Sequence, residues 1–180
     1  MTTVITVQGP DGGPGPASRE AGPVDVASMT ADDHDAVAAM FSRCSAATLR
    51  RRFHGITDGM AYLNGQLKAS EVVLLAKRGT SCVGLGVLAA DDPGPWDLGV
   101  LVEDAWQLCG VGTRLVTALV AEARRRQVTV IRADLLAENA FAVGLLRRIG
   151  PIAARADHAK ITVDVRLAPD AAARPRRGSG

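Results

Sequence analysis

Residues 98–120 read LGVLVEDAWQLCGVGTRLVTALV. An apolar segment typical of a buried strand runs into a short loop, which contains Gln107, Gly110 and Gly112 and leads directly into an amphipathic helix. Glycines allow tight turns and let backbone N–H groups approach a ligand closely. The unpaired N–H groups and the positive dipole end of the helix favour an anion. The stretch therefore predicts a site for a phosphate or pyrophosphate group.

The loop differs from both common phosphate-binding motifs. It lacks the Gly-Lys-Ser/Thr ending of a P-loop, and it has only two of the three glycines of the dinucleotide fingerprint. Its pattern is Gln-x-x-Gly-x-Gly, from Gln107 to Gly112. This pattern resembles the acetyl-CoA pyrophosphate loop of the GNAT superfamily of N-acetyltransferases. A plain tight turn is the alternative interpretation of the two glycines.

Size and composition are those of one ordinary globular domain. The chain has 180 residues, 47% of them apolar and 22% charged. The net charge of +2 is too small to indicate nucleic acid. Three separated cysteines and scattered histidines indicate neither a disulfide framework nor a metal site. No signal peptide or membrane-length apolar run is visible, so we expect a cytoplasmic protein without a membrane partner.

Apolar periodicity predicts one domain over residues 23–170, with a flexible leader at 1–22 and a flexible basic tail at 171–180. Thr30 and Ser45 are expected to cap the first two helices, and the arginines at 50–52 to lie on or near the surface. A short helix is one interpretation of residues 56–69. The predicted strands span residues 24–29, 71–77, 82–89, 96–102, 128–135 and 161–167. The predicted helices span residues 30–44, 45–53, 111–126 and 140–149.

This order of elements predicts an α/β domain with a mixed, mostly antiparallel central sheet and helices on both faces. The GNAT fold has the same order, so the resemblance covers about residues 23–168. A second motif, from Leu136 to Gly150, resembles the Asn-containing segment of the family, with Asn139 near the pantetheine. Asn139 is also a preferred helix N-cap, and both roles are compatible. We expect Phe141 on the buried face of the helix that follows.

The resemblance implies specific cofactor contacts. Backbone groups of the strand before the loop would pair with the pantetheine arm, and loop N–H groups would hold the pyrophosphate of acetyl-CoA. Two departures stand out. Leu108 and Cys109 replace a glycine and a basic residue, and Leu146 stands where many members have a tyrosine acid. The cofactor residues implied in this way are Leu101, Val102, Gln107, Leu108, Cys109, Gly110, Val111, Gly112, Thr113 and Asn139.

Two carboxylates are candidates for the base that an amine acceptor needs, because a lysine amine has a pKa near about 10.4. Asp97 stands on the strand before the loop, where family members more often have glutamate. An exposed aspartate at the strand start is its alternative interpretation. Glu103 is the second candidate, and a solvated loop acid is the favoured description of it.

The leading hypothesis is an acetyl-CoA-dependent N-acetyltransferase that transfers acetyl directly to a primary amine. Residues 45–55 resemble the matching part of bacterial GNAT domains that include protein-lysine acetyltransferases, so the acceptor is a protein lysine or a small-molecule amine. The alternative is a catalytically weak CoA-binding sensor or interaction module. Nucleic acid is the least favoured partner, and the oligomeric state is open, with a homodimer among the choices.

Overall fold

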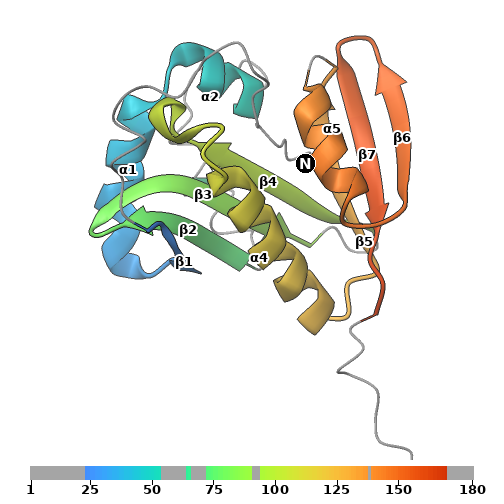
Figure 1. Cartoon of the computed structure of the whole chain (residues 1–180), viewed down its shortest axis with the longest axis horizontal. Coiled ribbons are helices and arrows are strands. Elements are labelled where there is room, and N and C mark those ends of the chain that lie inside the picture. Colours follow the sequence, from blue (N-terminus) through green and yellow to red (C-terminus); the bar gives the residue numbers. More distant parts are fainter. Residues whose placement is uncertain (1–22, 54–63, 66–71, 91–93, 138, 170–180) are drawn as a thin grey trace, which may run out of the picture.

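The computed structural model describes residues 23–53, 64–65, 72–90, 94–137 and 139–169. Seven strands form one sheet in the order β1-β2-β3-β4-β5-β7-β6 (Figure 1). Every neighbouring pair is antiparallel except β4 and β5, which are parallel. The strands are β1 (Asp25–Ser28), β2 (Val72–Arg78), β3 (Ser81–Ala89), β4 (Trp96–Val102), β5 (Val130–Leu136), β6 (Ile152–Asp157) and β7 (Lys160–Arg166).

Helices cover both faces of this sheet, as predicted. They are the 3-10 turns η2 (Ala31–Asp33) and η3 (Asp104–Trp106) and the helices α1 (His34–Arg43), α2 (Ala46–Phe53), α4 (Val111–Arg125) and α5 (Ala140–Arg147). The mixed, mostly antiparallel α/β fold is thereby confirmed. No described helix combines the length and hydrophobicity that a membrane span requires. The predicted leader and tail, and residues 56–63 and 66–69, lie outside the described residues.

The sequence prediction missed strand β6. Its residues after Ile152 are all exposed, so they show no alternation of apolar and polar side chains. β6 lies at the sheet edge and pairs only with β7, and Ile152 is its one residue packed against the core. An edge strand without a buried face carries no periodic signal in its sequence.

The core has two parts, one on each face of the sheet. On one face α4 and α5 pack against apolar side chains of β4 and β5, including Leu98, Val100 and Ile131. On the other face α1 packs against Leu75, Leu85 and further apolar side chains. Two glycines of β3 bring α4 close to the sheet: a Cβ at Gly84 would lie 3.0 Å from Leu115 Cδ1, and one at Gly86 would lie 2.8 Å from Leu119 Cδ1.

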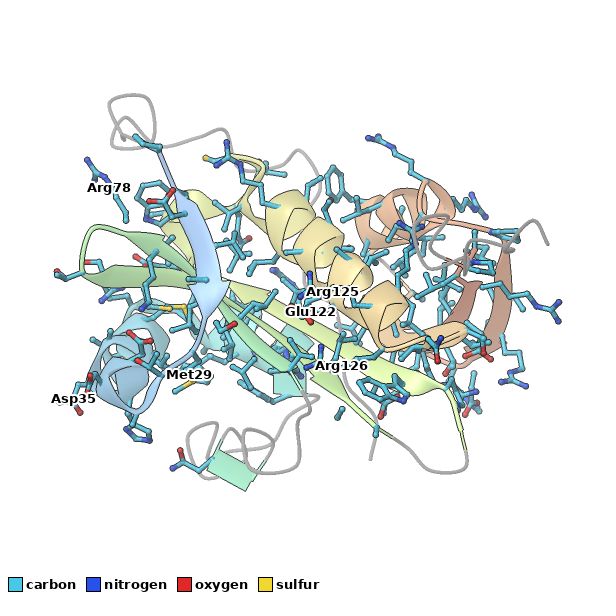
Figure 2. All side chains as sticks on the ribbon, turned by 90° about the horizontal axis from the view of Figure 1, so that it is seen from below. Met29, Asp35, Arg78, Glu122, Arg125 and Arg126 are labelled. Carbon is cyan, nitrogen blue, oxygen red and sulfur yellow. The ribbon has the colours of Figure 1, made fainter. Side chains whose placement is uncertain are left out.

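The helix ends follow the predicted chemistry. Asp33 accepts hydrogen bonds from the Thr30 backbone N–H (2.9 Å) and hydroxyl (3.0 Å), which fixes the chain at the start of the first helical segment. Ser45 Oγ accepts from the Thr48 N–H (3.2 Å) and caps α2. At the C-terminal end of α4, Arg125 and Arg126 both pair with Glu122 (Figure 2). Ser45 is confirmed as the N-cap of α2, and Thr30 is the N-cap of the 3-10 turn η2 that leads into α1, whose own N-cap is Asp33.

Two exposure predictions were wrong. Arg52 is only 2% exposed, and its guanidinium lies over the ring of Phe53, 5.2 Å from the ring centroid. Phe141 is 41% exposed, although its spacing matched the apolar face of α5. It lies in the first turn of α5, whereas Ala142, Leu145 and Leu146 supply the buried side of that helix.

Candidate functional site

Strands β4 and β5 form a fork. They pair only at their first residues, Trp96 with Ile131 and Asp97 with Arg132, and diverge beyond that point (Figure 1). On its other edge β4 stays paired with β3 as far as Val102. Between residues 98 and 102, therefore, no described strand pairs with the β5-side edge of β4. An extended ligand arm can bind such an edge through main-chain hydrogen bonds.

The loop at the open end of the fork is tied to α2 through Asp104. The Asp104 carboxylate accepts from the Ser45 N–H (2.8 Å), the Ser45 hydroxyl (2.7 Å) and the Thr48 hydroxyl (2.9 Å). Partial burial acts to raise the pKa of Asp104, but these hydrogen bonds outweigh it and hold the pKa below the ordinary 3.8. The carboxylate is thus a charged anchor that positions the loop.

Gln107 shapes the same loop from inside. Its side chain is 8% exposed, and its Nε2 donates to the Thr48 hydroxyl (3.1 Å) and to the Val102 carbonyl (3.0 Å). The sequence motif singled out Gln107 as a cofactor residue, and the structure directs its amide inward. Thr48, which joins Gln107 to Asp104, was missed because nothing in the sequence links it to residues 56 and 59 positions later.

The N-terminus of α4 presents backbone N–H groups at this loop. Gly110 is the N-cap with φ +82° and provides no capping side chain. This left-handed conformation suits glycine. Arg114 is the first residue whose N–H bonds back to the Gly110 carbonyl (3.0 Å), so the N–H groups of Val111, Gly112 and Thr113 precede the helical hydrogen-bond ladder.

The anion-binding potential of this loop comes from its backbone. Residues 103–110 contain no lysine or arginine, and the nearby Arg114 guanidinium donates to the Val24 carbonyl (2.8 Å). Leu108 and Cys109, which stand where family members often carry a glycine and a basic residue, are exposed, and Leu108 has φ +61°. Uncapped N–H groups and the positive end of the helix dipole are the features that favour an anion at such a position.

Asp97 lies at the closed end of the fork. It is 5% exposed, which overturns the interpretation as an exposed strand-start residue. Strand alternation places it on the same face as Leu101, which packs in the α1 cluster. Its neighbour Arg132 binds the Asp164 carboxylate through Nε (2.7 Å) and NH2 (3.1 Å). The Asp164 hydrogen bonds, with the charges of Asp164, Asp97 and Asp134, raise the pKa of Arg132.

Glu103 is not the solvated loop acid that the sequence favoured. It is 8% exposed, and its Oε2 accepts from Arg43 Nε (3.0 Å) and NH2 (2.9 Å). The same NH2 donates to the Cys82 carbonyl (2.8 Å), so the pair joins α1, β3 and the end of β4. The hydrogen bonds that Arg43 donates to the Glu103 carboxylate raise the pKa of Arg43. Sequence reasoning missed Arg43, which is 60 residues away in the chain.

The comparison with protein families decides the identity of the chain. The model of the acetyltransferase (GNAT) family matches residues 37–150, which include the whole fork and both of its helices. The chain belongs to the GNAT family of acetyltransferases. It is therefore an N-acetyltransferase that uses acetyl-CoA. A search of curated protein sequences gave no match.

Solved GNAT structures share the fold. The GNAT domain of S. lividans PAT superposes with a TM-score of 0.69 at 19% identity, covering 81% of this chain and 92% of that one. Ribosomal-protein-alanine N-acetyltransferase from Brucella melitensis gives 0.62 at 20% identity (80% and 99% covered). The acetyltransferase yncA from Salmonella typhimurium, solved with acetyl-CoA, gives 0.62 at 18% identity (83% and 99% covered).

The second GNAT motif, from Leu136 to Gly150, begins at the last residue of β5 and therefore lies beside the fork. The Asn139 side chain accepts from the Ala142 N–H (3.2 Å), so its predicted role as the N-cap of α5 is confirmed. Leu146, at the position of the family tyrosine, is fully buried in the core beside α4. It has no proton to donate, and Tyr62 lies outside the described residues. No tyrosine acid therefore borders the fork in the described part of the chain.

All three cysteines are free thiols. Burial raises the pKa of Cys44 to about 12 and that of Cys82 to about 11. These two thiols are therefore protonated and poor nucleophiles at neutral pH. Cys109 is exposed on the loop, with its Sγ 3.4 Å from the Gln107 carbonyl oxygen. Among the described residues no group of three or more His, Cys, Asp or Glu side chains is arranged to hold a metal ion.

Proposed function

We propose that this acetyltransferase transfers acetyl directly from acetyl-CoA to a primary amine, of a protein lysine or a small molecule, within a ternary complex. The observation that carries the proposal is the fork: β4 and β5 separate after Asp97 and Arg132, and the N-terminus of α4 lies at the open end. The free edge of β4 at Leu101 and Val102 would bind the pantetheine. The amides of residues 108–113 would hold the pyrophosphate.

Asp97 is the proposed base. It is a buried carboxylate at the point where the strands separate, on the face opposite α4. It would take a proton from the acceptor ammonium, directly or through water. The amine nitrogen then attacks the thioester carbonyl, the C–N bond forms, the C–S bond breaks and the thiolate leaves. The acylated nitrogen would then give its second proton to water, and water would return a proton to the thiolate, so that the products are the amide and the CoA thiol. Glu103, bound by Arg43, would position the end of β4.

The loop assignment is tested by placing a negative charge in the first turn of α4, at Thr113→Glu. A carboxylate there is favourable to the helix dipole, so the melting temperature should hold or rise. The same charge repels a pyrophosphate, and calorimetry should show at least a 10-fold loss of CoA affinity, about 1.4 kcal/mol. Thr113→Lys is the matched control, with tighter CoA binding. Equal CoA affinities in the two variants would contradict the assignment of the pyrophosphate to the N-terminus of this helix.

The proposed base is tested with Asp97→Asn. We expect kcat to fall by about 100-fold or more, the usual contribution of general base catalysis, while CoA binding is retained. Glu103→Gln is the comparison variant, and its kcat should stay within about 10-fold of the wild type. If Glu103→Gln lowered kcat more than Asp97→Asn does, Glu103 rather than Asp97 would be the base. CoA binding by a wild-type protein that acetylates no amine would favour the sensor or interaction module.

A further inference from the structure

Asp134 lies in the open part of the fork. Arg132 is the last residue of β5 in register with β4, and Asp134 comes two residues later. Ile131, Ala133 and Leu135 belong to the core under α4 and α5. Because side chains alternate along a strand, Asp134 lies on the opposite face, which is also the face of Asp97. Nothing in the sequence motifs pointed to Asp134.

The charge of Asp134 is only partly compensated. The carboxylate is 7% exposed, and its Oδ1 accepts from the Thr162 hydroxyl on β7 (2.7 Å). Within the described part of the chain no cation lies at ion-pair distance from Asp134, and no group there donates to Oδ2. The guanidinium of Arg132 is instead bound at two points by Asp164. Burying a carboxylate without a cation costs free energy, which a cationic ligand would recover.

We propose that Asp134 binds the protonated amine of the acceptor in the open fork and thereby selects cationic acceptors. This inference rests on the proposed function, because the fork is where the acceptor meets the thioester. An ammonium group carries three donors and no acceptor, which matches an unoccupied carboxylate oxygen such as Oδ2. Asp97 and Asp164 add negative charge on the same face, and Arg132 and Arg155 (3.3 Å from Asp164 Oδ2) oppose it.

The test compares two acceptors that differ in charge. Nα-acetyl-lysine amide is a cation at pH 7.5, whereas 4-methoxyaniline is neutral at that pH. Asp134→Asn keeps an oxygen for Thr162 and removes the charge. We expect this variant to raise the KM for the lysine derivative by about 10- to 100-fold, the effect of losing a hydrogen bond to a charged group. The KM for 4-methoxyaniline and the Kd of CoA should not change.

Two controls separate acceptor binding from structure and from net charge. Thr162→Val removes the hydrogen bond to Asp134 and keeps the carboxylate, so the KM for the lysine derivative should change by less than about 3-fold. Asp157→Asn makes the same charge change on an exposed residue of β6, and the KM should not move. Equal losses for the two acceptors in Asp134→Asn, or the same selective loss in Asp157→Asn, would overturn the inference.

The failure of this inference is distinguishable from the failure of the proposed function. If the wild type binds CoA but acetylates neither amine, the inference is tested by calorimetry, which measures the binding of Nα-acetyl-lysine amide to the CoA-loaded protein. Binding that is lost in Asp134→Asn supports the inference, and absence of binding overturns it while the cofactor site stands. If CoA itself does not bind, the proposed function and this inference both fail.

Discussion

The two faces of strands β4 and β5 differ sharply. The face under α4 and α5 is apolar, with Leu98, Val100, Ile131 and Ala133 in one core cluster. The opposite face carries Asp97 of β4 and charged side chains of β5 and β7. Successive residues of the same strand thus point alternately into the packed core and toward the proposed acceptor site. Under the proposed function, substitutions on one face should change stability, and substitutions on the other face should change activity.

The largest expected effect on stability comes from the packed face, at Gly86→Leu. The first added carbon would lie 2.8 Å from Cδ1 of Leu119, which is fully buried. Because the buried Leu119 side chain or α4 itself would have to shift, we expect urea denaturation to show a loss of about 1–3 kcal/mol. Gly144→Ala in α5 is the control, since no atom lies within 4 Å of its added methyl, and it should gain up to about 1 kcal/mol. Similar stabilities of the two variants would contradict the tight seating of α4.

A smaller effect on stability is expected on the charged face, at Asp164→Asn. The ion pair with Arg132 is about a quarter exposed on each side (26% and 23%), so its loss should cost less than about 1 kcal/mol. Arg132 would then keep Asp97 and Asp134 as its nearby negative charges and compete with a cationic acceptor. We therefore expect the loss of kcat/KM for Nα-acetyl-lysine amide, expressed as a free energy, to exceed the loss in the free energy of unfolding. A variant that loses more than about 1 kcal/mol of stability but keeps its kcat/KM would contradict the difference between the faces.

The smallest effect concerns acid stability at the loop. The folded pKa of Asp104 lies below its ordinary 3.8, so its contribution to stability is present above about pH 4 and is lost as the pH falls through the folded pKa. Asp104→Asn should lower the melting temperature at pH 7 and make it less dependent on pH between 4 and 3. Parallel curves for variant and wild type over this range would show that the carboxylate does not anchor the loop.

The same contrast explains which elements were predictable. Strands with one buried face, such as β5 and β7, show alternation, and the predicted bounds lie within about two residues of the observed ones. β6 has no buried face after Ile152 and was missed. The helix caps at Thr30 and Ser45 depend on atoms three residues apart, so they were predictable. The burial of Glu103 against Arg43 depends on α1, which is distant in the chain, and was not predictable.

By itself, the sequence determined the strand, loop and helix around Gly110 and Gly112 and the order of the elements other than β6, because turn geometry and periodicity are local. Acetyl-CoA chemistry was implied by the resemblance of its motifs to those of the GNAT family. The tertiary structure alone decided which charged groups meet. Arg43 finds Glu103 across 60 residues, Arg132 finds Asp164 across 32, and Asp134 is left in the fork without an ion-pair partner in the described part of the chain. These pairings depend on sheet order and strand register, which no local pattern encodes.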